Sequence, residues 1–351
     1  MAHNLLSDPA PDPAPARALP VINTEDHMKI LGAAAVESLL TIVQCVEVVD
    51  GAMRAVSAQQ VLSPLRTVMP LAPPNAMGIM PGAMLDHERF GIKVLALYPG
   101  NGALGLPSHA GVMVLFDAAT GTPLAVLDSN SVTALRTAAA SAVATRALAR
   151  PESGVLALLG TGHQALWHLH ALRTVMKIKR LQLWSRTAAS VAHFVDKLGA
   201  LEGIDIVAAA TAQDAVSGAD VVCTVSSSRE PILQGAWLEP GQHVNLVGAS
   251  VASAREADVE VVRRSRFFVD VRASAAVQAG EWLQALKEGV VAESHLQGEI
   301  GEVLLGRVPG RSSATDITVY KSLGHIAQDI ATADAVYRHA LERPEFSDLA
   351  W

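Results

Sequence analysis

The chain has 351 residues, of which 50% are hydrophobic and 17% are charged, and its formal net charge at pH 7 is -7. This length allows two ordinary domains with their own cores, and the composition excludes a disordered chain. The acidic balance argues against a nucleic-acid partner, which would require a basic face.

The N-terminal residues 1–22 are rich in Pro and Ala and are expected to form a flexible lead-in. They lack the basic region and the apolar core of a signal peptide. The most apolar stretch of membrane-spanning length, residues 30–49, carries Glu37 and Glu47. We therefore expect no membrane span and a cytoplasmic protein.

The spacing of the apolar residues changes twice between residues 26 and 150. Apolar residues spaced by three and four predict helical structure over residues 26–59. From Val61 to Leu127, short β-rich runs separated by Gly/Pro/Asn turns predict a mainly antiparallel sheet. Residues 131–150 then predict one long helix of small residues, with Pro151 marking its end.

Residues 154–270 alternate between apolar strands and stretches able to form helices, which is typical of a right-handed βαβ sheet. The strands are apolar almost throughout, as expected when helices cover both faces. The last section, residues 316–341, predicts a strand, a turn at Gly324 and a long helix that returns to the first domain. The strands expected in the alternating segment are VLALLG, RLQLWS, IDIVAA, DVVCTV, HVNLVG and RFFVD.

Residues 160–165, GTGHQA, fit a G-x-G-x-x-A pattern between an expected strand and an expected helix. Gly160 permits a tight turn, and Gly162 has no Cβ, so a pyrophosphate can approach the backbone. The N–H groups of the helix N-terminus, with His163 and Gln164, would then face the phosphates. The motif in this context predicts a dinucleotide cofactor.

The end of the second strand of this series bears on the choice between NAD and NADP. A carboxylate for the ribose 2′-hydroxyl is expected there for NAD, but the sequence has Ser185, Arg186 and Thr187. Arg186 can pair with a 2′-phosphate, and the two hydroxyls can donate to it. NADP(H) is therefore favoured, and NAD(H) stays open, because Arg186 would otherwise be a solvated loop residue.

The histidines and cysteines do not predict a metal site. His163, His168 and His170 have spacings of five and two, which do not match the i, i+4 spacing of helical metal ligands. We expect His163 in the turn, and the other two on the helix surface or at a subunit contact. Cys45 and Cys223 are distant and lie in apolar surroundings, so we expect buried, reduced thiols.

Many ordered blocks between residues 22 and 337 resemble the ornithine cyclodeaminase/μ-crystallin family, and within it the μ-crystallin-like ketimine reductases. The resemblance implies an α/β protein in which a doubly wound, parallel Rossmann domain (134–314) is inserted into a mixed α+β substrate-binding and dimerisation domain (23–133 plus 315–351). It also implies a homodimer. The blocks are PLRTVMP, GIMPG, GIKVLALYP, LPSHAGVMVLFD, LDSNSVTALRTAAASAVAT, LLGTGHQA, WSRT, SREPIL, VNLVGAS and TVYKSLG.

By the same resemblance, Arg66 binds the substrate carboxylate, Lys93 reaches the same pocket, and Arg136 lies near substrate and nicotinamide. Two of these positions are unusual by themselves. Lys93 interrupts an apolar strand, and Arg136 lies in a helix of small residues, where a buried Arg would need an anion. The resemblance assigns to the cofactor Thr137, Thr224, Val225, Ser226, Val247, Gly248, Ala249, Gly324 and His325.

One position departs from the cyclodeaminases of the family, which carry a catalytic aspartate where this chain has Ser250. A serine cannot act as that carboxylate at neutral pH. We therefore expect NAD(P)H-dependent reduction of a small cyclic ketimine carboxylate, with Lys93, Ser250 through a water, or His325 as the proton donor. Alternatives are an acyclic imino-acid reductase (alanine-dehydrogenase-like or acting on iminosuccinate), an ornithine or lysine cyclodeaminase, and a non-catalytic NADPH-binding protein.

Overall fold

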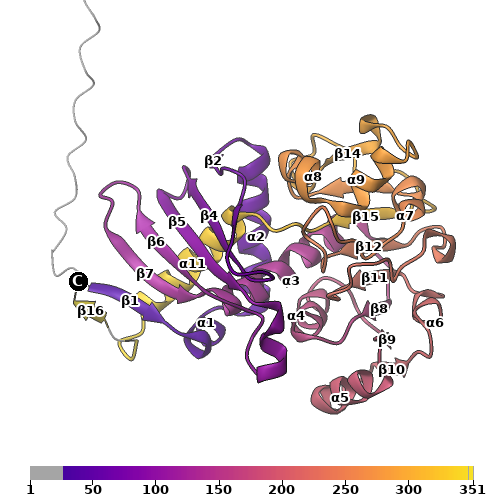
Figure 1. Cartoon of the computed structure of the whole chain (residues 1–351), viewed down its shortest axis with the longest axis horizontal. Coiled ribbons are helices and arrows are strands. Elements are labelled where there is room, and N and C mark those ends of the chain that lie inside the picture. Colours follow the sequence, from indigo (N-terminus) through magenta and orange to yellow (C-terminus); the bar gives the residue numbers. More distant parts are fainter. Residues whose placement is uncertain (1–26, 347, 351) are drawn as a thin grey trace, which may run out of the picture.

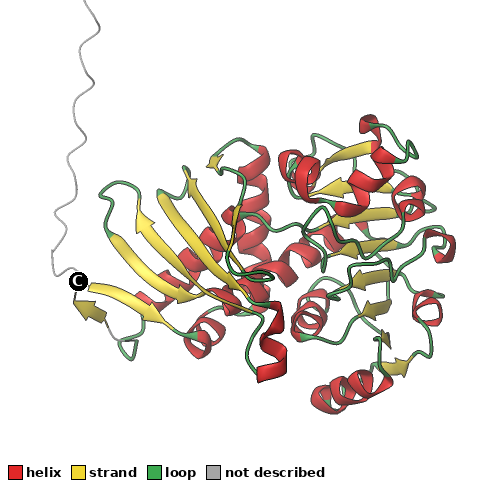
Figure 2. Ribbon diagram, in the orientation of Figure 1, coloured by secondary structure: helices red, strands yellow, loops and turns green. Residues whose placement is uncertain are grey.

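A computed structural model describes residues 27–346 and 348–350 of the chain. Two eight-stranded sheets lie side by side, each with helices packed against it (Figure 1, Figure 2). The lead-in expected over residues 1–22 lies outside the described residues. Within the described ranges, no helix combines the length and the apolarity needed to cross a membrane.

The first sheet is mixed, with the strand order β16-β1-β7-β6-β5-β4-β2 and with β3 paired to β4. Its pairings are antiparallel except for that of β1 with β7. The mainly antiparallel sheet expected from Val61 to Leu127 is confirmed. Its strands are β1 (His27–Leu31), β2 (Val61–Leu62), β3 (Thr67–Pro70), β4 (Ala76–Met84), β5 (Arg89–Leu97), β6 (His109–Asp117), β7 (Pro123–Asp128) and β16 (Asp348–Ala350).

The helical structure expected over residues 26–59 is wrong for its first five described residues, which form β1. Residues 29–31 pair in parallel with residues 125–127 of β7, so backbone hydrogen bonds to the sheet override the helical spacing. Helices follow as α1 (Ala33–Leu39) and α2 (Ile42–Ser57). α2 begins with a capping box in which Thr41 and Gln44 each bind the other's backbone N–H.

The long helix of small residues is α3 (Ser129–Leu148), and most of its 20 residues are buried. Asp128 caps it by accepting a hydrogen bond of 2.7 Å from the Ser131 N–H. α3 contacts α2 and α11 of the first half, and α4 and β12 of the second. It ends three residues before Pro151, and its small side chains let both halves pack closely against it.

The second sheet is parallel in all its pairings, with the order β10-β9-β8-β11-β12-β15-β13-β14. Alternate residues of one strand belong to cores on opposite faces: Leu156 and Leu158 to one, Ala157 and Leu159 to the other. The doubly wound α/β sheet is thus confirmed. Its strands are β8 (Val155–Leu159), β9 (Arg180–Trp184), β10 (Asp205–Ala208), β11 (Val221–Thr224), β12 (His243–Leu246), β13 (Arg266–Val269), β14 (Leu296–Glu299) and β15 (Thr318–Lys321).

Shorter helices connect these strands and flank the sheet in Figure 2. They are α4 (His163–Leu172), α5 (Ala188–Leu198), α6 (Ala212–Val216), α7 (Val259–Arg264), α8 (Arg272–Gln278), α9 (Gly280–Lys287) and α10 (Ile300–Leu304).

The chain leaves the parallel sheet through β15 and turns at Gly324 into α11 (Ile326–Leu341). α11 packs on α2, α3 and β4, so the return of the C-terminal helix to the first half is confirmed (Figure 1). The domain limits expected at 133/134 and 314/315 fall inside α3 and just ahead of β15. The division of the chain into those two domains stays a prediction.

Candidate active site

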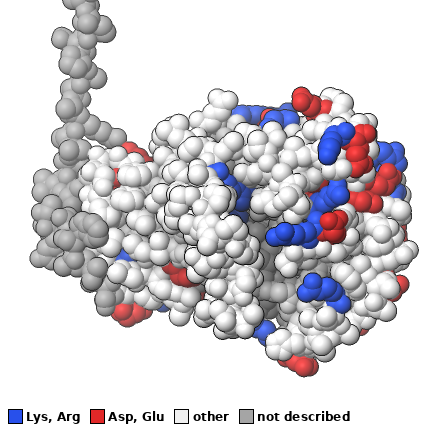
Figure 3. Space-filling view, viewed as in Figure 1, with Lys and Arg blue, Asp and Glu red and all other residues white. Residues whose placement is uncertain are grey.

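Three basic side chains from different elements converge where the two halves meet. Arg66 precedes β3, Lys93 lies on β5 and Arg136 on α3. Lys93 is 1% exposed and Arg136 is 6% exposed, whereas Arg66 is half-buried. In Figure 3 a hollow separates the two parts of the molecule, and basic side chains lie at its margin. The convergence implied by the family resemblance is present.

Asp329 of α11 joins two of these cations. Its Oδ1 accepts hydrogen bonds from Lys93 Nζ at 2.7 Å and from Arg136 Nε at 3.1 Å. Its Oδ2 is buried and has no hydrogen-bond partner among the described residues. Burial alone would raise the pKa of Asp329, but the charges and hydrogen bonds of Arg136 and Lys93 hold it below its ordinary value.

Burial lowers the pKa of Lys93 from 10.5 to about 8. Asp329 opposes this decrease, whereas the charges of Arg136 and Arg66 add to it. An amine with a pKa near neutrality can both give up and regain a proton under physiological conditions. Lys93 is therefore a candidate proton donor, as expected from the sequence.

Arg66 connects the two halves of the molecule. Its Nη2 donates to Gln278 Oε1 at 2.5 Å and to the Leu323 carbonyl at 2.7 Å, and its Nη1 lies 3.5 Å from Ser250 Oγ. Burial, and then the charge of Arg136, lower its pKa. Arg66 and Ser250, which are 184 residues apart, are therefore brought together as expected.

The turn between β15 and α11 is shaped around Arg136. Asp270, directly after β13, accepts hydrogen bonds from the N–H groups of Leu323 at 2.5 Å and Gly324 at 2.7 Å. Gly324 has a φ of +83°, and a Cβ there would lie 2.8 Å from Arg136 Nη1. The positive φ therefore favours glycine, and a Cβ at this position would displace the Arg136 guanidinium.

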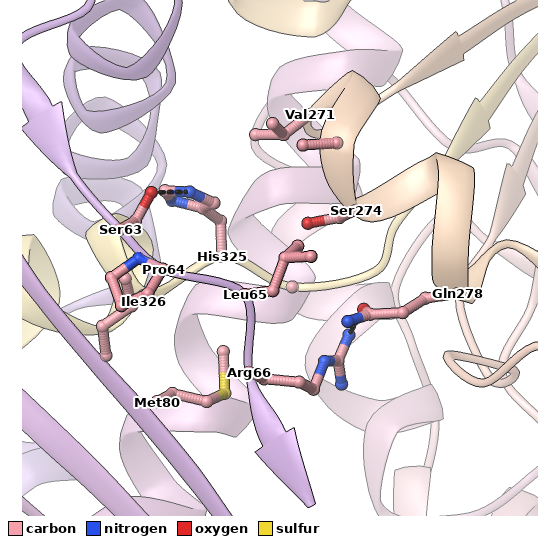
Figure 4. Close-up of a pocket in the computed structure, with 12 residues that line it drawn as sticks. Ser63, Pro64, Leu65, Arg66, Met80, Val271, Ser274, Gln278, His325 and Ile326 are labelled. Atoms are coloured by element: carbon pink, nitrogen blue, oxygen red, sulfur yellow. Dashed lines mark hydrogen bonds between the residues drawn. The ribbon is translucent and has the colours of Figure 1, made fainter.

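A pocket opens beside Arg66, as Figure 4 shows. The Arg66–Gln278 pair lies on one side of it and a Ser63–His325 pair on the other, with 2.9 Å between Ser63 Oγ and His325 Nε2. The backbone N–H of Ala327 donates to His325 Nδ1 at 3.2 Å, so His325 caps α11. Because Nδ1 accepts, the neutral ring carries its proton on Nε2, and burial lowers its pKa.

The carboxyl end of β8 has the properties needed for a dinucleotide. Gly160 has a φ of +116°, and a Cβ there would lie 2.8 Å from the Val225 carbonyl oxygen. A Cβ on Gly162 would meet nothing within 4 Å, so the N-terminus of α4 is open to a pyrophosphate. Thr137 Oγ1 and Gln164 Oε1 are buried without a hydrogen-bond partner in the described chain. These residues fit a nicotinamide dinucleotide, and His163 is exposed at the same turn.

The predicted cofactor residues after β11 and β12 are held together by Glu256, a wholly buried carboxylate that the sequence analysis missed. Oε1 accepts from Ser226 N and Oγ, and Oε2 accepts from Thr224 Oγ1, all at 2.7 Å. Oε2 also accepts from Gly248 N at 2.5 Å. Val225, Val247 and Ala249, beside these donors, are buried.

The end of β9 presents the residues expected to select the cofactor. Arg186 and Thr187 are exposed and Ser185 is half-buried. Thr187 Oγ1 caps α5 by accepting from Ser190 N at 3.2 Å. Arg186 makes no hydrogen bond or ion pair within the part of the chain that the structure describes, which leaves its guanidinium able to meet a ligand. Its role stays a prediction.

His168 is not at a surface, contrary to the expectation. It is wholly buried, with Nε2 3.1 Å from Ser141 Oγ and Nδ1 2.8 Å from the Gln164 carbonyl. Burial lowers its pKa to about 4, so it packs α4 on α3 as a neutral ring. His170 is exposed, and the buried, free state expected of Cys45 and Cys223 is confirmed.

Comparison with known proteins places this site in a family. Residues 26–343 match the model of the ornithine cyclodeaminase/mu-crystallin family. The mouse (Mus musculus) ketimine reductase mu-crystallin is 37% identical over 79% of this chain and 85% of its own length. The alanine dehydrogenase of Archaeoglobus fulgidus is 32% identical over 90% and 95%.

A solved structure of similar fold supports the same family. It is that of Thermococcus litoralis Δ1-pyrroline-2-carboxylate reductase in complex with NADH and L-proline. It superposes with a TM-score of 0.87 and 33% identity, over 90% of this chain and 98% of the other. The chain therefore belongs to the ornithine cyclodeaminase/mu-crystallin family.

Proposed function

We propose that the protein reduces the C=N bond of a small cyclic ketimine carboxylate with NADPH. The substrates would be Δ1-pyrroline-2-carboxylate or Δ1-piperideine-2-carboxylate, and the products proline or pipecolate. The net positive charge of the site supports a substrate with a single carboxylate, and the identity to ketimine and Δ1-pyrroline-2-carboxylate reductases supports a cyclic imine.

The general class of reaction is supported by the family and by the site together. The protein is an NAD(P)H-dependent oxidoreductase that acts on carbon–nitrogen bonds of imines or amino acids. Relatives at similar identity are named for ketimine reduction, Δ1-pyrroline-2-carboxylate reduction and alanine dehydrogenation, so the ring and the chain length of the substrate belong to the proposal.

The charges in and behind the pocket beside Arg66 favour a substrate with a single carboxylate. Three cations, Arg66, Lys93 and Arg136, meet two buried carboxylates, Asp329 and Asp270, which leaves one net positive charge. One substrate carboxylate would balance that charge, whereas a second would be buried without a counter-charge. The other polar groups of the pocket beside Arg66 are neutral, including Ser63, Ser274, Gln278 and the neutral ring of His325.

The residues of the chain divide the work of the reaction. Arg66 and Arg136 bind the substrate carboxylate and orient the face of the imine. Lys93 protonates the imine nitrogen, which makes the neighbouring carbon electrophilic. When bound, the nicotinamide supplies the hydride that reduces this carbon. Ser250 touches Arg66 at 3.5 Å and helps to fix the guanidinium.

A second candidate is an acyclic imino-acid reductase, favoured by the identity to an alanine dehydrogenase. Such an enzyme must bind free ammonia or a small acyclic imine. Cyclodeaminase activity is less favoured because Ser250 replaces the catalytic aspartate.

NADPH is proposed over NADH because of Arg186. The side chain is exposed at the end of β9, between Ser185 and Thr187, and no carboxylate occupies these three positions. A guanidinium there would pair with the 2′-phosphate of NADPH, whereas NADH would offer it no anion.

A homodimer is proposed through the face of the first sheet opposite its helices. That face carries outward-pointing apolar side chains, including Ile30 at 55% and Val112 at 42% exposure. Phe90 and Phe116 stack on adjacent strands with ring centroids 4.8 Å apart. An apolar sheet face of this kind is typical of a protein interface, and the molecular mass in solution would test it.

Steady-state assays test the reaction. NADPH and NADH should be compared against five- and six-membered cyclic ketimine carboxylates, acyclic imines and iminosuccinate, with ornithine assayed for ammonia release. We expect the highest kcat/KM for a cyclic monocarboxylate with NADPH. Preference for an acyclic imine would select the second candidate, ammonia release from ornithine would select a cyclodeaminase, and NADPH binding without turnover would exclude an enzyme for these substrates.

A further inference from the structure

The roles above leave one buried charged group of the site without a function. Asp329 is 0% exposed and, like Lys93 and Arg136, is not among the residues that line the pocket beside Arg66. Its Oδ1 receives both cationic donors, Lys93 and Arg136, and its Oδ2 receives none from the described residues. A buried oxygen without a donor costs stability, so its presence calls for a structural or functional explanation.

Asp329 lies at the junction of three elements. Lys93 comes from β5, Arg136 from α3, and Asp329 itself from α11. The neighbouring Gln328 accepts from Arg136 Nη1 at 3.0 Å, so two successive residues of α11 hold that guanidinium. The other hydrogen bond of Lys93 Nζ, to Thr133 Oγ1, is long at 3.4 Å. The position of the Lys93 ammonium therefore depends mainly on Asp329.

We propose that Asp329 is a positioning residue of the reaction. It fixes the Lys93 ammonium and the Arg136 guanidinium relative to the imine carboxylate, and it keeps Lys93 in the protonated form that donates to the imine nitrogen. This inference rests on the imine reduction proposed above and deepens it.

The reaction balances with Asp329 unchanged. Lys93 Nζ gives a proton to the imine nitrogen and becomes a neutral amine. The carbon receives a hydride with its two electrons from NADPH, so the C=N bond becomes a CH–NH bond and NADP⁺ is released. Lys93 then regains a proton from water. The Asp329 carboxylate neither gains nor loses a proton.

The charges that face Lys93 show why Asp329 is needed. They are Asp329 from α11, Arg136 from α3 and Arg66 from the segment before β3. Of these three, Asp329 alone favours the charged ammonium, and burial and both arginines disfavour it. Without the Asp329 charge, Lys93 would lose its proton at a pH below its present pKa of about 8.

The test is the pH profile of kcat for imine reduction in the full chain. Wild-type activity should hold below pH 8 and fall above it, because the donor must be protonated. In Asp329→Asn we expect this fall to begin about 1 pH unit lower. We also expect kcat at pH 7 to decrease about tenfold. Asp329→Glu keeps the charge on a longer side chain, so the fall should stay near pH 8 while kcat decreases.

Asp334→Asn is the matched control. Asp334 is a buried carboxylate of the same helix, and it pairs with Arg89 and Arg338, both at 2.8 Å, away from Lys93. We expect a lower Tm and an unchanged pH profile.

Three outcomes are separable. A wild-type enzyme that reduces no imine refutes the proposed function. A wild-type enzyme that reduces imines, with a folded Asp329→Asn variant whose profile does not move, overturns the role of Asp329 alone. If Asp329→Asn does not fold, Asp329→Glu decides, because full kcat in that variant would contradict positioning.

Discussion

Two buried carboxylates, one in each half of the molecule, are used in opposite ways. Glu256 lies beneath the loops after β11 and β12 and accepts four hydrogen bonds, from the hydroxyls of Thr224 and Ser226 and the N–H groups of Ser226 and Gly248. Asp329 accepts two, both from cations, and leaves one oxygen unpaired among the described residues.

The titration of the two groups differs accordingly. Burial raises the pKa of Glu256, and Lys321 and the donors only partly oppose it. Burial acts on Asp329 in the same direction, but Arg136 and Lys93 reverse the result. Equal burial therefore does not imply an equal role, and the charge of the partners decides it. Glu256 joins the ends of β11 and β12 through hydrogen bonds, whereas Asp329 binds the two cations on which the proposed reaction depends.

The largest effect on turnover should come from removing Lys93, the ammonium group that Asp329 binds. Lys93→Met deletes the proton donor while keeping an unbranched side chain, so kcat should fall by about 100-fold or more. The dissociation constant of NADPH, followed by nicotinamide fluorescence, should stay close to that of the wild type. Full turnover in this variant would show that the proton comes from elsewhere.

A smaller effect should follow from displacing the second cation. Gly324→Ala places a methyl group against Arg136, in addition to the strain of a positive φ, and kcat/KM should fall by about tenfold or more. Gly306→Ala is the matched control, because its φ is +70° and a Cβ would meet nothing within 4 Å. It should lower Tm similarly but preserve kcat/KM, and equal losses of activity in the two variants would contradict the contact with Arg136.

On the dinucleotide side, Arg186→Ala should raise KM for NADPH by about tenfold, because a charge-assisted hydrogen bond to phosphate is lost. KM for NADH should not change. Arg180 is an exposed residue of β9, the strand that precedes Arg186, and pairs with Asp205 at 2.8 Å, so Arg180→Ala should change neither value. An equal effect of Arg186→Ala on both cofactors would argue against recognition of the 2′-phosphate.

Glu256→Gln should have the smallest effect on turnover. The amide would turn an N–H group toward donors such as Gly248 N, so the two loops should loosen and Tm should fall. We expect KM for NADPH to rise about threefold, with no change in the pH profile of kcat. Glu260→Gln, on the partly exposed ion pair with Arg263, is the control. A shift in the pH profile of kcat in Glu256→Gln would contradict the difference in role between Glu256 and Asp329.

The sequence predicted the features that depend on neighbouring residues. The turn at Gly160, the strands β8 to β13 and α3 follow from local spacing, and they are confirmed. The strand β14 was not expected, and β15 was expected as a strand but not as part of the parallel sheet. β1 was not foreseen, because its conformation depends on pairing with β7. His168 was misplaced because its partner, Ser141, lies on α3.

Only the family resemblance predicted that Arg66, Lys93 and Arg136 would lie together. Neither the local sequence pattern nor the resemblance identified Asp329. Asp329 lies 236 residues from Lys93 in sequence, and nothing in the local pattern connects them. A signal did exist, since Asp329 interrupts the buried apolar face of α11. Asp270 likewise directly follows the apolar strand β13, at the carboxyl end of the parallel sheet.

α3 sets a distance between the two reactants. Arg136 and Thr137 are consecutive residues of this helix, and their side chains diverge by about 100° around its axis. The family resemblance implies Thr137 at the cofactor, and the proposed reaction has Arg136 at the substrate carboxylate; one step of the helix would then separate the two anchors. Motion of one half of the molecule relative to the other would change the access of the substrate. The spacing between the hydride-donating carbon of the cofactor and the accepting carbon of the imine would stay constant.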